Sequence, residues 1–167
     1  MQQHIKYLNG NNMKLIRFAL ISVLVIGLLI TAISSLFPSV VITSRAVEVN
    51  ATALQIQHCV KELSAWKGWM SDWKEQSVTV KDSIAYVGTQ TIQMLSSTDS
   101  TVVLNWVATG QAPYKVQIEW LPLKEGTYVI HWSFEQHVKW YPWEKLGSFM
   151  NDKILGPMME QNLLNLK

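Results

Sequence analysis

The sequence predicts an α+β domain, in which helices cover one face of an antiparallel sheet, preceded by one N-terminal transmembrane helix. Three observations lead to this prediction. An uncharged apolar run lies near the N-terminus, the middle of the chain alternates between apolar and polar residues, and residues 143–167 carry apolar side chains at helical spacing. With 167 residues in all, residues 38–167 are enough for one domain.

The apolar run extends from Phe18 to Phe37, twenty residues without a charge. At about 1.5 Å of rise per residue, a helix of this length spans roughly 30 Å, the thickness of the hydrocarbon core of a bilayer. The run is longer than the apolar part of a typical signal peptide, about 7–15 residues, so we expect a retained anchor. Basic residues without acidic ones precede it, so the positive-inside rule places residues 1–17 in the cytoplasm and residues 38–167 across the membrane.

Charge and cysteine content exclude several functional classes. Residues 1–37 have a net charge of +3 and residues 38–167 a net charge of −1, so the domain has no basic surplus for binding nucleic acid. The single cysteine, Cys59, excludes an internal disulfide and a metal site built from several cysteines. The glycines do not cluster into a phosphate-binding loop, and we predict no cofactor.

The first part of the domain combines a strand with a helix. Residues 39–49 are rich in β-branched side chains and predict a strand, and residues 52–64 then follow helical spacing. Trp66, Trp69 and Trp73 come next at spacings of three and four, so they could share one helical face.

A period of two then predicts further strands. Four short ones are expected at residues 76–80, 83–87, 90–95 and 101–107. Two longer ones, Tyr114–Trp120 and Thr127–Glu135, alternate strictly, and residues 123–126 join them as a hairpin in which Gly126 can take a positive φ. Strict alternation is typical of an antiparallel sheet with one solvent face and one covered face.

Residues 143–167 predict a long last helix. The pair Gly156-Pro157 in its middle predicts a kink or a break there. The predicted buried stripe consists of Leu146, Phe149, Met150, Ile154, Met158 and Leu164.

Two stretches of the domain point to a family. The first is Arg45-x-Val47-x-Val49-Asn50-Ala51, followed by Trp66 and Trp69, and the second is Asp152-Lys153-Ile154-Leu155-Gly156-Pro157. The first resembles the first strand, the Asn-Ala-Pro helix start and the Trp-x-x-Trp of the START-like (SRPBCC, polyketide-cyclase-type) proteins. The second is similar to the C-terminal helix of members that carry an N-terminal membrane segment. The resemblance covers residues 39–167, although Thr52 stands where the family usually has Pro.

This resemblance implies a helix-grip fold, in which a curved antiparallel sheet surrounds the long C-terminal helix and a cavity lies between them. The covered faces are aromatic and apolar, as in pockets for apolar ligands, although the same side chains could fill a closed core. The candidate cavity residues are Trp106, Trp120, Tyr128, Ile130, Trp132 and Phe134 from the strands and Phe149 and Met150 from the helix.

The sequence shows no catalytic constellation. His131 is expected on the solvent face beside Glu119 or Glu135, where it forms an ordinary cross-strand pair. His58 and Cys59 are adjacent on a helix and point in different directions, so they are poorly placed as a nucleophile and its base. No set of metal ligands has a suitable spacing.

Residues 137–143 (His-Val-Lys-Trp-Tyr-Pro-Trp) lie between the last strand and the last helix. Three interpretations fit: a well-packed corner, an amphipathic mouth over the cavity, or a contact with the membrane interface, where Trp and Tyr are favoured.

The function that these features favour is non-covalent binding of a hydrophobic or amphipathic small molecule, such as a lipid, by a membrane-anchored domain. Two alternatives remain: a polyketide cyclase/dehydrase-like enzyme, and a tethered protein-interaction module with a closed core and no ligand. The sequence names no protein partner.

Overall fold

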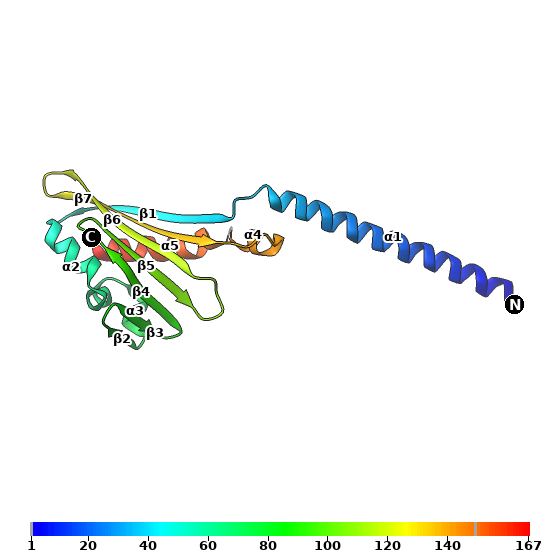
Figure 1. Ribbon diagram of the computed structural model, residues 1–167, viewed down its shortest axis with the longest axis horizontal. Coiled ribbons are helices and arrows are strands. Elements are labelled where there is room, and N and C mark those ends of the chain that lie inside the picture. The colour runs from blue at the N-terminus through cyan, green and yellow to red at the C-terminus, as the bar shows by residue number, and fades with distance from the viewer. Residues whose placement is uncertain (1, 149) are drawn as a thin grey trace.

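The computed structural model describes residues 2–148 and 150–167, and within them one long helix projects from a domain with a seven-stranded sheet (Figure 1). The long helix is α1 (Gln2–Ser35). Strand β1 (Val40–Asn50) follows, then α2 (Ala53–Lys61), the 3-10 helix η1 (Leu63–Gly68) and α3 (Ser71–Glu75). The remaining elements are β2 (Val78–Lys81), β3 (Ile84–Val87), β4 (Gln90–Ser97), β5 (Thr101–Ala108), β6 (Tyr114–Lys124), β7 (Thr127–His137), α4 (Pro142–Ser148) and α5 (Asn151–Leu166).

The sheet is antiparallel, with the strand order β1-β7-β6-β5-β4-β3-β2. Its strands β2 to β7 form a meander, and β1 pairs with β7 along its whole length. The sheet curves around α5, which confirms the predicted α+β helix-grip architecture (Figure 1). The predicted strands are confirmed in order and in place, and Gly126 takes a φ of 71° in the β6–β7 turn as expected.

Alternation assigns the faces of the two long central strands. In β6 the side chains of Val116, Ile118 and Trp120 are buried, while the residues between them are more exposed. His131 lies directly opposite Glu119 in the β6–β7 register, which confirms the predicted cross-strand neighbour.

Helix α1 contains the predicted apolar run. The span from Asn12 to Ser35 contains an 18-residue window with a mean hydropathy of 2.6, so it is long and apolar enough to cross a membrane or to serve as a signal sequence. Its side chains from Asn12 to Ile33 are exposed, and none of the side chains described for α1 belongs to the core of the domain.

The tryptophans after α2 do not lie on one continuous helix. Trp66 belongs to η1, Trp69 follows η1, and Trp73 belongs to α3. All three are buried, with ring centroids 5.1 Å (Trp66–Trp69) and 5.5 Å (Trp66–Trp73) apart. The break in the helix lets two indole N–H groups satisfy carbonyls at the end of α2. Trp66 Nε1 donates to Val60 O (3.0 Å) and Trp69 Nε1 to Cys59 O (3.1 Å).

Of the kink or break predicted at Gly156-Pro157, the break is wrong. The chain leaves helical geometry between α4 and α5, and Pro157 lies inside α5. Proline at this position removes one intrahelical hydrogen bond, because it has no N–H. The packing of α5 in the curved sheet outweighs that loss.

The predicted buried stripe of the last helix is wrong at Met150, Ile154 and Leu164, while Met158 is half-buried against the core. Ile154 and Leu164 are 66% and 60% exposed, whereas Gly156, Met159 and Leu163 are buried. The helix carries apolar residues on several sides, so contacts from other elements decide which side faces inward.

Two of these contacts use polar or small residues. Asn162, which is buried, accepts a hydrogen bond from Ser71 N at 2.9 Å through Oδ1. Gly156 leaves room for the guanidinium of Arg45 on β1, which donates to Glu160 Oε1 (2.6 Å) and Asp152 Oδ1 (3.0 Å) on α5. Hydrogen bonds to Asp152 and Glu160 raise the pKa of Arg45 above its ordinary value. A hydrophobic stripe cannot reveal such contacts.

We predict that Arg45 and Gly156 are energetically coupled. A Cβ at position 156 would overlap Arg45 Nη2, so in the natural background Gly156→Ala must displace the guanidinium from its carboxylates. In an Arg45→Ala background the same substitution should stabilise the protein by about 1 kcal/mol, because alanine is a better helix former. Urea unfolding of the four proteins of the double-mutant cycle measures the coupling. Equal effects of Gly156→Ala in both backgrounds would contradict it.

Candidate functional site

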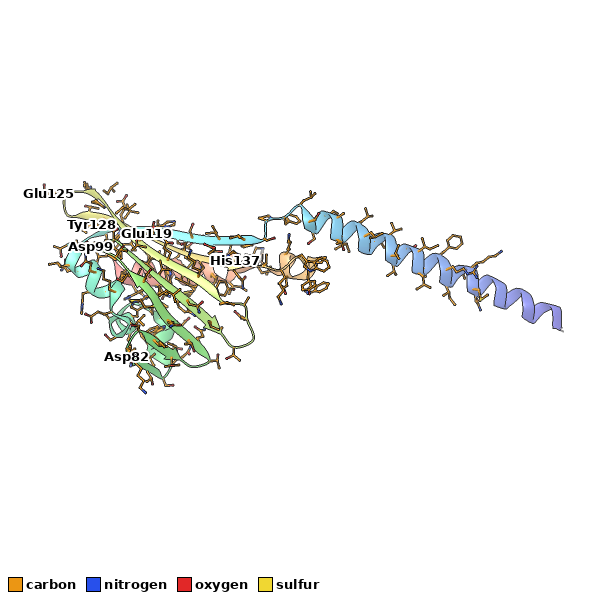
Figure 2. All side chains as sticks on the ribbon, viewed as in Figure 1. Asp82, Asp99, Glu119, Glu125, Tyr128 and His137 are labelled. Carbon is orange, nitrogen blue, oxygen red and sulfur yellow. The ribbon has the colours of Figure 1, made fainter. Side chains whose placement is uncertain are left out.

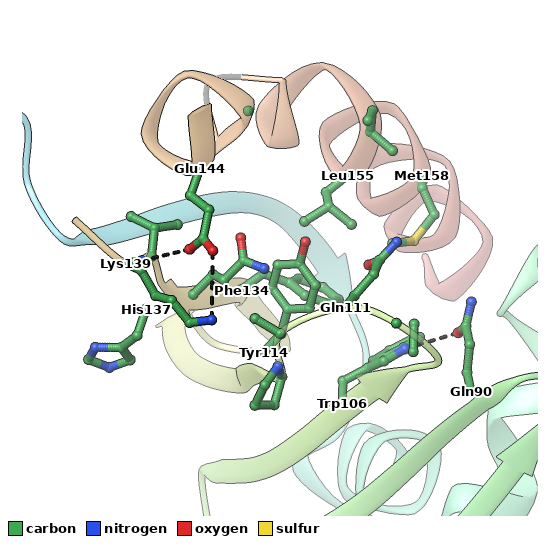
Figure 3. A pocket seen from close by; sticks show the side chains of 18 of the residues that line it. Gln90, Trp106, Gln111, Tyr114, Phe134, His137, Lys139, Glu144, Leu155 and Met158 are labelled. Atoms are coloured by element: carbon green, nitrogen blue, oxygen red, sulfur yellow. Dashed lines mark hydrogen bonds and ion pairs between the residues drawn. The ribbon is translucent and has the colours of Figure 1, made fainter. Parts of the chain in front are cut away.

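A cavity of about 1070 Å³ lies between the sheet and the helices α4 and α5 (Figure 3). Its wall on the sheet comes from one end of the strands: the start of β4, the end of β5, the start of β6 and the end of β7. The β5–β6 turn, residues 138–139, α4, the first half of α5 and Asp72 of α3 complete it. This volume reaches the upper end of the range of about 300–1,000 Å³ typical of small-molecule pockets.

The floor of the cavity is aromatic. Trp106 on β5 and Phe134 on β7 are both buried, with ring centroids 5.3 Å apart, and Tyr114 on β6 meets Phe134 edge-on at 5.8 Å. The Trp106 indole N–H is already used, because Nε1 donates to Gln90 Oε1 at 2.9 Å. Trp106 therefore offers a ligand its apolar face, and the polar contacts must come from other residues.

The opposite wall belongs to α5. Leu155 and Met158 are half-buried and face the floor across the cavity (Figure 3). Methionine adapts its shape to irregular apolar neighbours, so this wall suits a flexible apolar ligand.

The rim next to α4 is polar. Lys139 N donates to Glu144 Oε2 at 2.9 Å, and Lys139 Nζ lies 3.8 Å from Glu144 Oε1. His137 is exposed, with Nε2 3.1 Å from Glu135 Oε1. These groups remain at the edge of the cavity, in contact with solvent.

Tyr114 and Gln136 supply polar groups farther in. They are paired in the β6–β7 register, and both line the cavity. Burial raises the pKa of the Tyr114 hydroxyl, and a hydrogen bond with Gln136 opposes that shift. The phenol is therefore neutral at physiological pH and can donate a hydrogen bond to a ligand.

The eight predicted cavity residues are distributed over several environments. Trp106 and Phe134 line the cavity. Trp120, Ile130 and Trp132 are buried in the packed core, because the tryptophans that follow α2 fill the space beside the sheet at that level; Trp69 and Trp132 are 5.6 Å apart.

The other three lie elsewhere. Tyr128 is half-buried at the end of the domain away from α1 (Figure 2). Met150 is exposed in the turn before α5. Phe149 lies outside the described residues.

Sequence reasoning missed four uncharged polar lining residues and the carboxylates of Asp72 and Glu144. Tyr114 and Gln136 have the same alternation as Val116 and Phe134, so the period of two could have identified them. Gln90 and Gln111 lie at a strand end and in a turn, where no periodicity indicates which side chains face the cavity.

His58 and Cys59 lie outside the lining of the cavity. His58 lies 3.6 Å from Glu62 on the surface of α2, and both side chains are exposed. Within residues 2–148 and 150–167, no group of three or more His, Cys, Asp or Glu side chains is placed to hold a metal ion. The cavity combines an aromatic floor, an adaptable apolar wall and a few hydrogen-bonding groups.

No protein-family profile matches the sequence, and no curated protein matches it. Solved structures do match. A Thermobifida fusca protein is 16% identical, with a TM-score of 0.57 over 75% of this chain and 89% of that chain. A Nitrosospira multiformis protein is 10% identical, with a TM-score of 0.59 over 75% and 93%.

The chain is also similar to StfQ, a di-domain ARO/CYC from the steffimycin biosynthetic pathway, at 11% identity and a TM-score of 0.59. The match covers 77% of this chain and 49% of StfQ, about half of the di-domain protein. At such identities the likeness concerns the fold alone, and this chain has the helix-grip fold.

Proposed function

We propose that the chain is a membrane-anchored binding protein that holds a hydrophobic or amphipathic small molecule, such as a lipid, between the sheet and α5. The cavity of about 1070 Å³ with its aromatic floor carries the proposal. In this proposal residues 1–17 form a cytoplasmic tail, residues 18–37 span the membrane, and residues 38–167 bind the ligand on the far side.

Affinity would come from burial of apolar ligand surface against Trp106, Phe134, Leu155 and Met158. Such burial contributes roughly 25 cal/mol per Å², before the cost of ordering the ligand is subtracted. The Tyr114 hydroxyl is suited to hydrogen-bond a polar end of the ligand, which would orient it in the cavity.

The two alternatives have less support. An enzyme of the cyclase/dehydrase type would need an acid–base group facing the ligand. Of the carboxylates that line the cavity, Glu144 is engaged with Lys139 at the rim and Asp72 is exposed. An interaction module would need a closed core, and a large cavity argues against that.

A cavity-filling substitution tests the binding site. We expect residues 38–167, whose core does not include α1, to bind cis-parinaric acid saturably, with energy transfer from tryptophan as the readout. Ala108→Phe places a ring in the cavity and should weaken binding at least tenfold. The matched control is Val107→Phe, the neighbouring residue on the opposite face of β5, and it should bind like the natural protein. Equal binding by both variants would contradict the proposed site.

The ionisation of Tyr114 gives an independent test. Burial disfavours the phenolate, so the 295 nm titration of the natural protein minus that of Tyr114→Phe should show a pKa above the ordinary value of about 10. The neutral phenol contributes stability below the pKa of the unfolded chain, and this stability is lost as pH rises through the folded pKa. A saturating apolar ligand should raise the pKa further. A ligand-independent titration would place the ligand elsewhere.

A further inference from the structure

The end of the domain next to α1 exposes a cluster of aromatic side chains, Trp140, Tyr141 and Trp143, which we call the aromatic patch. Trp140 and Trp143 are 64% and 68% exposed. The Tyr141 ring lies 4.8 Å from that of Trp140 and stacks on that of Trp143 at 5.0 Å, with 5° between the planes. The chain has eight tryptophans, all in its described part, and the other six are at most 7% exposed.

Helix α4 holds the aromatic patch beside the end of α1. Ile30, Ile33 and Phe37 of the apolar run line a hollow of about 170 Å³ together with Pro142 and Lys145 of α4. Lys145 Nζ donates to Phe37 O at 2.6 Å, which ties α4 to the end of the run. The patch therefore lies at the level where α1 would leave the hydrocarbon core.

The connection between α1 and the sheet is too short to lift the domain away from a membrane. Only residues 36–39 separate α1 from β1. Fully extended, four residues reach at most about 14 Å, and one interfacial region takes up roughly 5–8 Å of that distance.

The cavity lies at this same end. Its rim includes Lys139, directly before the patch, and Glu144 and Gly147 of α4. Figure 2 places His137, at the rim, on the side of α1, and Glu125 and Tyr128 at the opposite end of the domain.

We propose that the aromatic patch rests in the interfacial region of the membrane that α1 crosses, and that the cavity takes its ligand directly from that leaflet. The ligand is then a membrane-dissolved amphiphile. This inference rests on the proposed function. Indole and phenol rings combine an apolar body with a polar N–H or O–H, so they are favoured at the interface between headgroups and acyl chains.

The contact is aromatic and not electrostatic. The exposed Lys139 is paired with Glu144, and His137 with Glu135, so each basic side chain described at the rim is matched by a carboxylate. Neutral phosphatidylcholine should therefore be sufficient, and added salt should have little effect. An apolar ligand that enters here does not have to cross water, which is the most costly part of its transfer.

Tryptophan quenching tests the contact. The full chain is reconstituted in phosphatidylcholine vesicles with bromine at shallow or deep acyl positions, and α1 contributes no tryptophan to the signal. We expect shallow bromines to quench part of the emission, more strongly than deep ones and equally at 50 and 500 mM salt. Trp140→Ser/Trp143→Ser should abolish this quenching. No quenching in the natural protein, or equal quenching in the double variant, overturns the inference.

The matched control changes two exposed apolar residues at the opposite end. Leu121 and Leu123 on β6 are 58% and 54% exposed. Leu121→Ser/Leu123→Ser should leave the quenching unchanged. Near-ultraviolet circular dichroism of both double variants verifies that they fold, because the six buried tryptophans dominate that signal.

Photocrosslinking tests the route of the ligand. A diazirine-bearing fatty acid in the same vesicles should label residues 106–114 of the natural protein, and Trp140→Ser/Trp143→Ser should reduce this labelling at least fivefold. The same double variant of residues 38–167 should still bind cis-parinaric acid in solution. Undiminished labelling of the double variant overturns the route.

Ala108→Phe distinguishes a failure of the proposed membrane contact from a failure of the proposed binding site. It should abolish cavity labelling and leave quenching by shallow bromines intact. If labelling persists in Ala108→Phe, the cavity is not the binding site and the proposed function fails. If quenching is absent while Ala108→Phe still blocks dye binding, the membrane contact fails and the proposed function stands.

Discussion

Tryptophan packing at one end of the space between the curved sheet and α5 decides where the domain is solid and where it is hollow. Trp66, Trp69 and Trp73 enter this space from the segment after α2, and Trp132 meets them from the sheet. Each indole is large and rigid, so a few of them fill the volume that a curved sheet leaves beside a helix. No comparable group enters from the described residues at the other end, where the cavity lies.

The packed part and the cavity therefore lie at opposite ends of the domain. The solid end contains the β6–β7 turn, and the hollow end faces α4 and α1 (Figure 1). If α1 crosses a membrane as we propose, a binding site at this end needs neither a moving lid nor a long linker. Helix α4 is the element that connects these features, since it contributes to the rim of the cavity, contacts the end of α1 and carries Trp143.

Polar and small residues fix the rotation of α5 against the sheet, although most of the surrounding contacts are apolar. Gly156 accommodates Arg45, and Asn162 satisfies the backbone N–H of Ser71 at the start of α3. A hydrogen bond to a buried group has few alternatives, so it selects one rotation of the helix more sharply than apolar packing does. This rotation turns Leu155 and Met158 toward the cavity and leaves Ile154 mostly exposed at its edge.

The sequence alone determined the strands, their covered faces, the turn at Gly126 and the apolar N-terminal helix, because each depends on residues close together in the chain. A period of two or an uncharged run is visible without any partner. The tertiary structure decided which side of α5 is buried, where the last helix breaks, and which aromatics line the cavity. Those outcomes depend on pairs far apart in sequence. Arg45 on β1 meets Glu160 on α5, and Trp69 fills the space beside Trp132, so neither result can be read from local spacing.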